Sequence, residues 1–128
     1  MLQTSRLILR QWTDHDLVPF AQLNADPEVM EYFPAPLSGA ESNAFANTIR
    51  PLIGQRGWGL WAVEVPGQAA FIGFVGLHIP ANDLPCSPCV EIGWRLAKAH
   101  WGRGYASEAA EAALAYAFGE LGLDEVVS

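Results

Sequence analysis

Cysteine and histidine are scarce in this chain of 128 residues, which has two of the former and three of the latter. The cysteines, Cys86 and Cys89, form a Cys-Ser-Pro-Cys segment, a spacing that occurs in redox pairs and in halves of zinc sites. A zinc site needs two further ligands, but the histidines show no His-x-x-x-His spacing. A thioredoxin-type pair would open a helix, whereas Pro85 and Pro88 indicate a loop. The sequence therefore predicts no metal site and no redox role.

Basic side chains are half as common as acidic ones, with 7 Lys and Arg against 14 Asp and Glu and a net charge of −7. Such a charge disfavours direct binding of nucleic acid and favours a cationic partner such as an amine. No stretch approaches the roughly 20 apolar residues of a membrane-spanning helix, and no signal-peptide pattern opens the chain. We therefore expect a cytoplasmic protein without a membrane partner, folded as one globular domain over residues 1–128.

Two closely spaced glycines lie in residues 99–109, between a polar strand and an alanine-rich segment. The segment reads Ala-His-Trp-Gly-Arg-Gly-Tyr-Ala-Ser-Glu-Ala. Because Gly102 and Gly104 lack a β-carbon, successive backbone N–H groups can turn toward one bound anion. A helix that follows them adds the positive end of its dipole. The pattern predicts a phosphate-binding loop made by the backbone of residues 101–106.

Other kinds of phosphate-binding loop fit this segment less well. A dinucleotide-binding loop needs a third glycine at the place of Ser107 and an apolar strand before it, whereas this strand holds Glu91 and Arg95. A nucleotide P-loop needs Gly-Lys-Ser or Gly-Lys-Thr, and no such run follows. On these residues alone, an ordinary glycine-rich turn before a helix is the remaining alternative.

Together with residues 90–96 (Val-Glu-Ile-Gly-Trp-Arg-Leu), this loop resembles the acyl-CoA-binding motif of the GNAT superfamily of N-acetyltransferases. The Trp-Gly-x-Gly run that begins at Trp101 is similar to the RimJ/RimL-like branch, the N-terminal acetyltransferases of ribosomal proteins. Three more segments, 5–11, 26–30 and 71–77, resemble the family's first strand, inter-helix segment and third strand in the right order. The resemblance implies an α/β GNAT fold, with helices flanking a mixed, mostly antiparallel, twisted sheet.

Capping and turn residues predict where the elements begin and end. Thr13 with Asp16, and Ser38 with Glu41, have the spacing of helix capping boxes, and Gly57 predicts the end of the second helix. The other expected elements are strands at 7–9, 58–65, 70–77, 89–96 and 123–128 and an alanine-rich helix at 105–121.

The sequence stops before the last segments that the resemblance implies. A complete domain of this family continues with the rest of a fifth strand, a helix and two closing strands. Those segments supply an asparagine that contacts the pantetheine arm and, in many members, a hydroxyl that protonates the leaving thiolate. We therefore expect a C-terminally truncated domain whose uncovered sheet edge favours a homodimer or larger species.

Acetyl transfer from a thioester to an amine needs a neutral amine, a polarised carbonyl and a protonated leaving thiolate. The resemblance implies that Glu91 is the base, on the strand beside the acetyl group. The alternative is that Glu91 pairs with Arg95 or with the substrate amine without taking a proton. The resemblance also implies a bulge near Gly93 that frees an N–H group for the thioester oxygen. Tyr105 is a candidate acid.

The resemblance implies acetyl-CoA as cosubstrate and assigns its contacts to the end of this strand and the loop. The expected contacts are Trp94, Arg95, Leu96, Trp101, Gly102, Arg103, Gly104, Tyr105 and Ala106. We expect Tyr32 and Phe33 to line the acceptor pocket, with ordinary packing as the alternative. For Glu108, in the first turn of a helix, we expect only a favourable interaction with the helix dipole.

The expected reaction is direct transfer of acetyl to a primary amine in a ternary complex. An α-amine has a pKa of about 7.7–8, against about 10.4 for lysine, so more of it is the reactive free base at neutral pH. This favours a protein or peptide N-terminus as acceptor. The alternatives are a non-catalytic acyl-CoA-binding module, a fragment that needs a partner chain, and an acetyltransferase for a polyamine or aminoglycoside.

Overall fold

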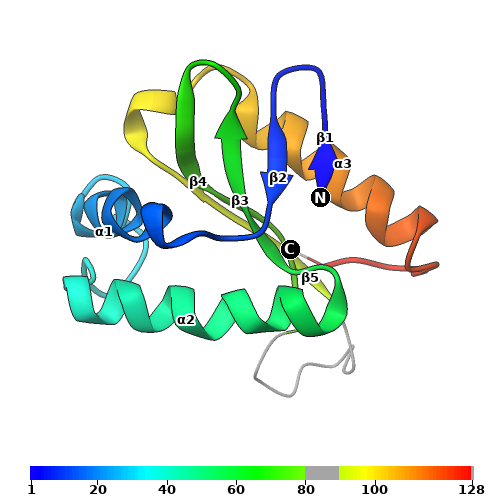
Figure 1. Cartoon of the computed structure of the whole chain (residues 1–128), viewed down its shortest axis with the longest axis horizontal. Coiled ribbons are helices and arrows are strands. Elements are labelled where there is room, and N and C mark those ends of the chain that lie inside the picture. Colours follow the sequence, from blue (N-terminus) through cyan, green and yellow to red (C-terminus); the bar gives the residue numbers. More distant parts are fainter. Residues whose placement is uncertain (80–89, 128) are drawn as a thin grey trace.

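The computed structural model describes residues 1–79 and 90–127, and its centre is a five-stranded sheet (Figure 1). The strands are β1 (Leu2–Gln3), β2 (Ile8–Arg10), β3 (Leu60–Val65), β4 (Ala69–His78) and β5 (Glu91–Leu96). The helices are α1 (Leu17–Ala25), α2 (Gly39–Arg56) and α3 (Tyr105–Gly119), and 3-10 turns at Asp14–Asp16 and Lys98–His100 precede α1 and α3. The predicted α/β fold is confirmed. The expectation for Cys86 and Cys89 lies outside the described residues.

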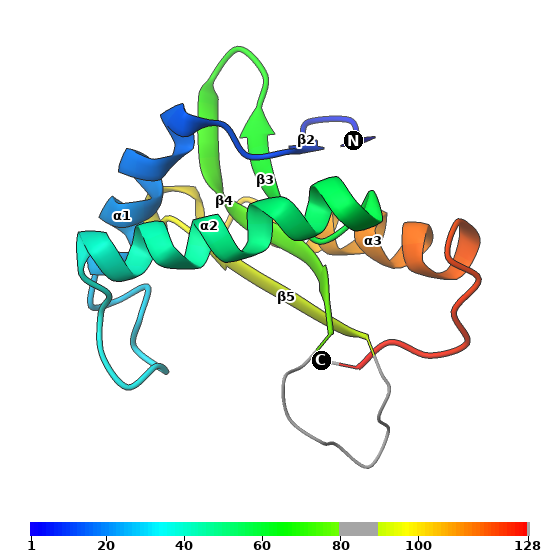
Figure 2. The same ribbon diagram turned by 60° about the horizontal axis from the view of Figure 1, so that its bottom comes forward.

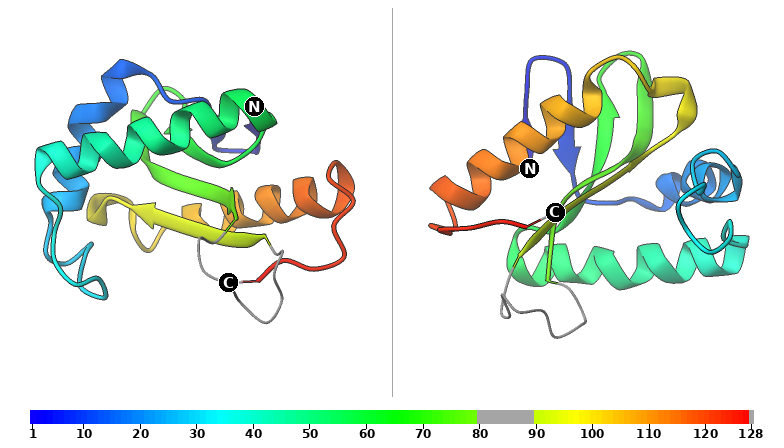
Figure 3. Two further views of the ribbon diagram at one scale, coloured as in Figure 1. Left: turned by 90° about the horizontal axis from the view of Figure 1, so that it is seen from below. Right: turned by 180° about the vertical axis from the view of Figure 1, so that it is seen from behind.

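Helices α1 and α2 cover one face of the sheet and α3 covers the other (Figures 2 and 3). On the first face, the ring of Phe20 in α1 packs against Phe74 of β4, with 6.0 Å between ring centroids. On the other face, Trp61 of β3 meets Tyr116 of α3 edge to face at 5.5 Å. Both layers therefore bury large aromatic side chains against the middle of the sheet.

Both predicted capping boxes form. The Ser38 hydroxyl accepts a hydrogen bond from the Glu41 N–H at 3.1 Å, and the Glu41 carboxylate accepts one from the Ser38 N–H at 2.9 Å. Asp16 accepts a hydrogen bond from the Thr13 N–H at 2.8 Å, so a 3-10 turn leads into α1. Gly57 ends α2 in the left-handed region, with φ of +80°. For the strands expected at 7–9, 58–65, 70–77 and 89–96 and the helix at 105–121, the ends differ from the observed ones by two residues at most. The strand expected at 123–128 is reduced to a single bridge at Val127 among the described residues, and β1 was not predicted.

Strand β4 lies so close to its neighbours that two of its positions admit no side chain. A Cβ atom at Gly73, where φ is +144°, would lie 2.1 Å from the carbonyl oxygen of Arg95 in β5. A Cβ atom at Gly76 would lie 1.9 Å from the carbonyl oxygen of Gly59. These glycines set the spacing between β4 and the strands on both sides of it.

The predicted bulge near Gly93 is wrong for the pairing of β5 with β4. Their register runs without a shift from Gly73 opposite Leu96 to His78 opposite Glu91, and Gly93 pairs with Gly76. The register shift of the sheet lies instead between Val63 and Val65, where β3 approaches its hairpin with β4. Two facing glycines allow close, regular pairing, so β5 needs no bulge there.

The outer edge of β5 is the place where the sheet becomes mixed. Val127 forms a parallel bridge with Glu91, and the Ile92 N–H donates to the Val127 carbonyl at 2.8 Å. Within the described residues, no strand covers the rest of this edge. The edge from Trp94 to Leu96 therefore presents free backbone groups next to the glycine loop.

Candidate active site

The loop before α3 presents a row of unused backbone N–H groups. Gly102 and Gly104 have φ of +74° and +78°, and Gly104 begins α3 without any side-chain cap. Within the described residues, the N–H groups of residues 102–107 donate to no acceptor. A helix leaves its first N–H groups without internal partners, and here none of the described residues replaces them. The loop is therefore built to receive an anion.

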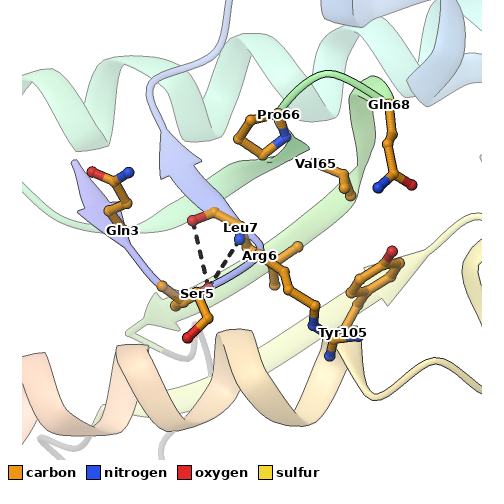
Figure 4. A pocket seen from close by; sticks show the side chains of 9 residues that line it. Gln3, Ser5, Arg6, Leu7, Val65, Pro66, Gln68 and Tyr105 are labelled. Carbon is orange, nitrogen blue, oxygen red and sulfur yellow. Dashed lines mark hydrogen bonds between the residues drawn. The ribbon is translucent and has the colours of Figure 1, made fainter.

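Arg6 holds this loop from the N-terminal hairpin. Its guanidinium donates to the Arg103 carbonyl at 2.9 Å and to the Glu108 carboxylate at 2.7 Å. It also lies over the ring of Tyr105, 4.6 Å from the centroid. Figure 4 shows Arg6 and Tyr105 side by side at a cavity of about 330 Å³, which is also lined by Val65 and its neighbours in the β3–β4 turn. The shape of the loop thus depends on contacts far away in the sequence.

Glu108 does more than the predicted interaction with the helix dipole. It accepts hydrogen bonds from the Thr4 hydroxyl and from the N–H and guanidinium of Arg6. Burial acts to raise the pKa of Glu108, but these hydrogen bonds outweigh it and the pKa is lowered. Glu108 therefore fastens the N-terminal hairpin to the first turn of α3.

The edge of β5 connects the loop to the middle of the sheet. Because N–H groups alternate sides along a strand and that of Ile92 points away from β4, the backbone groups of Trp94 and Leu96 point outward as well. The Leu96 carbonyl accepts a hydrogen bond from the Trp101 indole at 2.9 Å. Trp94 and Trp101 are 52% and 44% exposed, which is unusual for tryptophan. Exposed aromatic side chains beside free backbone groups indicate a binding surface.

Glu91 lies on the face of the sheet that α1 and α2 cover, paired with a residue that sequence reasoning missed. The Nε2 atom of His78 is 3.1 Å from the Glu91 carboxylate, and both side chains are about one-third exposed. The Nδ1 atom of His78 is buried and has no partner among the described residues. A proton there would be a buried, unsatisfied donor, so we assign the proton to Nε2, which donates to Glu91.

The other candidate partner of Glu91, Arg95, points toward α1. It is 9% exposed and donates to the Asn24 side chain at 2.8 Å, and Asn24 in turn donates to the Ser42 hydroxyl at 2.9 Å. Its guanidinium carbon lies 4.5 Å from the ring centroid of Phe33. Burial lowers the pKa of Arg95. The side chain of Arg95 therefore lies on the opposite face of the sheet from α3, away from the glycine loop.

The predicted acceptor residues lie in different settings. Tyr32 is 93% exposed, whereas Phe33 packs over Arg95. Their segment is tied to the fold by the Leu37 N–H, which donates to the Asn24 carbonyl at 2.8 Å, and by an ion pair of Glu28 with Lys98. The structure thus brings Phe33, and not Tyr32, next to β5.

Two further features of the described residues concern metal ions and membranes. Within the described residues, no three or more His, Cys, Asp or Glu side chains group together as a metal ion would require. No helix among them is both long and apolar enough to cross a bilayer. Among the described residues, the candidate site brings together an anion-binding loop, a free strand edge and a carboxylate.

Comparison with known proteins finds one family along nearly the whole chain. The model of the acetyltransferase (GNAT) domain matches residues 6–128. The uncharacterized N-acetyltransferase YoaA of Bacillus subtilis is 30% identical over 128 residues, which cover 98% of this chain and 71% of the relative.

Solved structures agree with this assignment. A GNAT-family acetyltransferase from Bacillus anthracis is 26% identical, with a TM-score of 0.80 over 98% of this chain and 70% of the other. A spermidine N-acetyltransferase from Vibrio cholerae, solved with CoA and spermine, is 28% identical, with a TM-score of 0.71 over 96% and 70%. The sequence pattern, the fold and these comparisons agree, and the chain belongs to the GNAT family of acetyltransferases.

Proposed function

We propose that this chain transfers the acetyl group of acetyl-CoA to a primary amine, and that the cosubstrate's pyrophosphate binds the N–H groups of residues 102–107. The observation that carries the proposal is that these six groups have no partner in the described residues, at the uncapped start of a 15-residue helix. Gly102 and Gly104 supply the left-handed turns that direct successive N–H groups to one side. The CoA complex of the Vibrio cholerae relative supports the same ligand class.

The edge of β5 suits the pantetheine arm. An extended arm with amide groups can pair with an open strand edge as an added strand does. Trp94 directs its free N–H and carbonyl groups, and Leu96 its N–H group, toward this edge. The exposed rings of Trp94 and Trp101 supply apolar surface beside it. An arm that starts at the glycine loop and follows this edge leads toward Gly93 and Glu91.

Glu91 is the proposed base. His78 holds one carboxylate oxygen, so the other can take a proton from the acceptor amine. The neutral amine nitrogen then forms a bond to the thioester carbonyl carbon and the carbon–sulfur bond breaks. The departing thiolate takes up the proton that the nitrogen loses on becoming an amide. Acetyl-CoA supplies the activated acyl group, and transfer is direct, without an acyl-enzyme. Tyr105 lies at the start of α3, on the face of the sheet away from Glu91, which weakens its case as the acid.

For the acceptor, two sources of a primary amine have specific support. The Trp-Gly-Arg-Gly run at 101–104 resembles the RimJ/RimL-like branch, which favours the α-amine of a peptide or protein. The Vibrio cholerae relative is a spermidine N-acetyltransferase, which favours a polyamine. We favour the α-amine, in a site between Glu91 and the segment that carries Phe33.

The loop assignment is tested by CoA affinity in glycine variants with a matched control. Gly104→Val places a branched side chain in the loop at a positive φ, and we expect the Kd for CoA to rise at least about tenfold, equivalent to about 1.4 kcal/mol. Gly57→Val imposes a similar strain at φ of +80°, at the end of α2, and should leave the Kd unchanged. Calorimetry and thermal unfolding separate binding from stability. Unchanged CoA affinity in folded Gly104→Val protein would contradict the proposal.

A further inference from the structure

Arg95 is a buried cation without an acidic partner. Within the described residues it forms no ion pair, whereas the other buried charge, Asp16, is held by Arg10 at 2.8 and 2.9 Å. One guanidinium nitrogen donates to Asn24, and the Nε atom is buried with no acceptor. Buried charges in proteins are normally paired, because removing an ion from water costs several kcal/mol. An unpaired buried guanidinium therefore points to a missing anionic group.

The position of Arg95 along β5 indicates where that group comes from. Glu91, Gly93 and Arg95 alternate onto the same face of the strand, beneath α1 and α2. Gly93 lies between the other two, is half-buried, and has no side chain to separate them. The atoms nearest to a Cβ there would belong to the His78 and Leu60 side chains, at 3.5 to 3.8 Å, which is ordinary van der Waals contact. The proposed base, a glycine and the cation thus follow one another along the strand.

The cosubstrate does not supply this anion. Its phosphates are assigned to the loop at the start of α3, on the opposite face of the sheet, and its pantetheine arm is uncharged. Of the three phenylalanine rings around the guanidinium, that of Phe33 is nearest at 4.5 Å and is 45% exposed, whereas Phe74 is 5% exposed. The guanidinium is therefore nearest to solvent on the side of the segment between α1 and α2, which is the proposed acceptor side.

We propose that Arg95 binds a carboxylate of the acceptor, so that the preferred substrate is an amine with a carboxylate a few bonds away, its nitrogen toward Glu91 and its carboxylate toward Arg95. This inference rests on the proposed acetyltransferase function. The carboxylate can belong to a free amino acid or to an acidic first side chain of a peptide. A polyamine would instead place a second ammonium group next to a buried guanidinium, which is unfavourable.

The experiment compares acceptors that differ in the carboxylate alone. Release of CoA thiol from acetyl-CoA is measured with each of four acceptors. They are an amino acid, the amide of the same amino acid, a C-terminally amidated peptide that begins with aspartate, and spermidine. We expect kcat/KM for an acid-bearing acceptor to exceed that for the amide at least about tenfold, as expected for a bond to a charged group. In Arg95→Met this ratio should fall to near one, and in Arg95→Lys it should be intermediate.

A control variant and a binding measurement test whether the carboxylate effect is specific to Arg95 and independent of turnover. Arg50→Met removes an exposed arginine that pairs with Asp14 and should keep the wild-type ratio. Calorimetry with CoA present compares an N-acetyl amino acid with its amide, so that the carboxylate effect is measured without turnover. Thermal unfolding checks that Arg95→Met is folded, which its similar length and apolar surroundings favour.

The outcomes separate this inference from the function on which it rests. Equal use of the acid, the amide and spermidine, or a ratio and a product affinity that Arg95→Met leaves unchanged, would overturn the role of Arg95 while acetyl transfer itself stands. Failure to bind CoA would overturn the acetyltransferase proposal. Selective use of the peptide over the free amino acid would identify the acidic side chain as the source of the carboxylate.

Discussion

At the scale of single residues, the proposed chemistry depends on one carboxylate, Glu91. Replacement by Gln keeps the size and removes the ability to take a proton. We expect Glu91→Gln to lower kcat by about 100- to 10,000-fold, the range for loss of a general base, with little change in the Kd for CoA. Steady-state kinetics and calorimetry provide the two measurements. A loss of less than about threefold would mean that Glu91 only positions the acceptor.

His78 positions the Glu91 carboxylate through the hydrogen bond from its Nε2 atom. His78→Gln keeps an N–H donor near the place of Nε2, whereas His78→Leu removes it and fills similar space. We expect the Leu variant to lose about tenfold in kcat, the value of one hydrogen bond to a charged group, and the Gln variant to keep most of the activity. KM for acetyl-CoA should change in neither. Equal kinetics in the two variants would show that His78 only fills space.

At the scale of elements, the contact between the N-terminal hairpin and α3 has a pH-dependent strength. Since the folded pKa of Glu108 lies below its unfolded value, the charged carboxylate stabilises the fold above about pH 4.5, and the contribution disappears as the pH falls through the folded value. The Arg6 side chain is 44% exposed, so we expect Glu108→Gln to cost only about 0.5–1 kcal/mol at pH 7. The difference from wild type should vanish once the pH has fallen below the folded pKa of Glu108.

Urea unfolding at several pH values measures this difference. Glu111→Gln is the control, because Glu111 is exposed on the same helix and forms no ion pair within the described residues. A Glu108 variant as stable as wild type at pH 7 would show that the hairpin is held by packing alone.

Most elements of this fold follow local rules, and the sequence predicted all of them except β1, while the strand expected at 123–128 is only a bridge at Val127. Capping boxes at Thr13 and Ser38 and the stop at Gly57 depend on residues within one or two turns. The prediction of a bulge near Gly93 failed because a bulge depends on which residue of the neighbouring strand lies opposite. The facing glycine, Gly76, becomes relevant only when the strands are paired.

The same limit explains what sequence reasoning missed in the site. The motif led to the loop and to Glu91, since both lie in one continuous segment. His78 stands opposite Glu91 only through the register of β4 and β5, and Asn24 meets Arg95 only through packing of α1 on the sheet. Contacts between segments that are distant in the chain carry no local pattern, so the partners of the predicted residues had to come from the structure.

At the scale of the whole molecule, the five tryptophans report on cosubstrate binding. Trp12 and Trp61 are buried, Trp58 is half-buried, and only Trp94 and Trp101 are well exposed. We expect acrylamide to quench chiefly these two, and saturating CoA to protect them, because both border the proposed path of the pantetheine arm. Trp101→Phe should reduce the protected fraction, whereas Trp58→Phe should not. CoA binding without any change in quenching would place the arm elsewhere.

The close packing of β4 against β5 at Gly73 connects sequence change on β4 with the choice of acceptor amine. Only a hydrogen atom fits between this position and the carbonyl oxygen of Arg95, so any larger residue at 73 would push the backbone of β5 away at Arg95 and Leu96. Such a change would move Arg95, although position 73 itself faces neither the amine nor its carboxylate. Relatives can therefore come to acetylate different amines through substitutions on β4, the strand next to the one that contacts the acceptor.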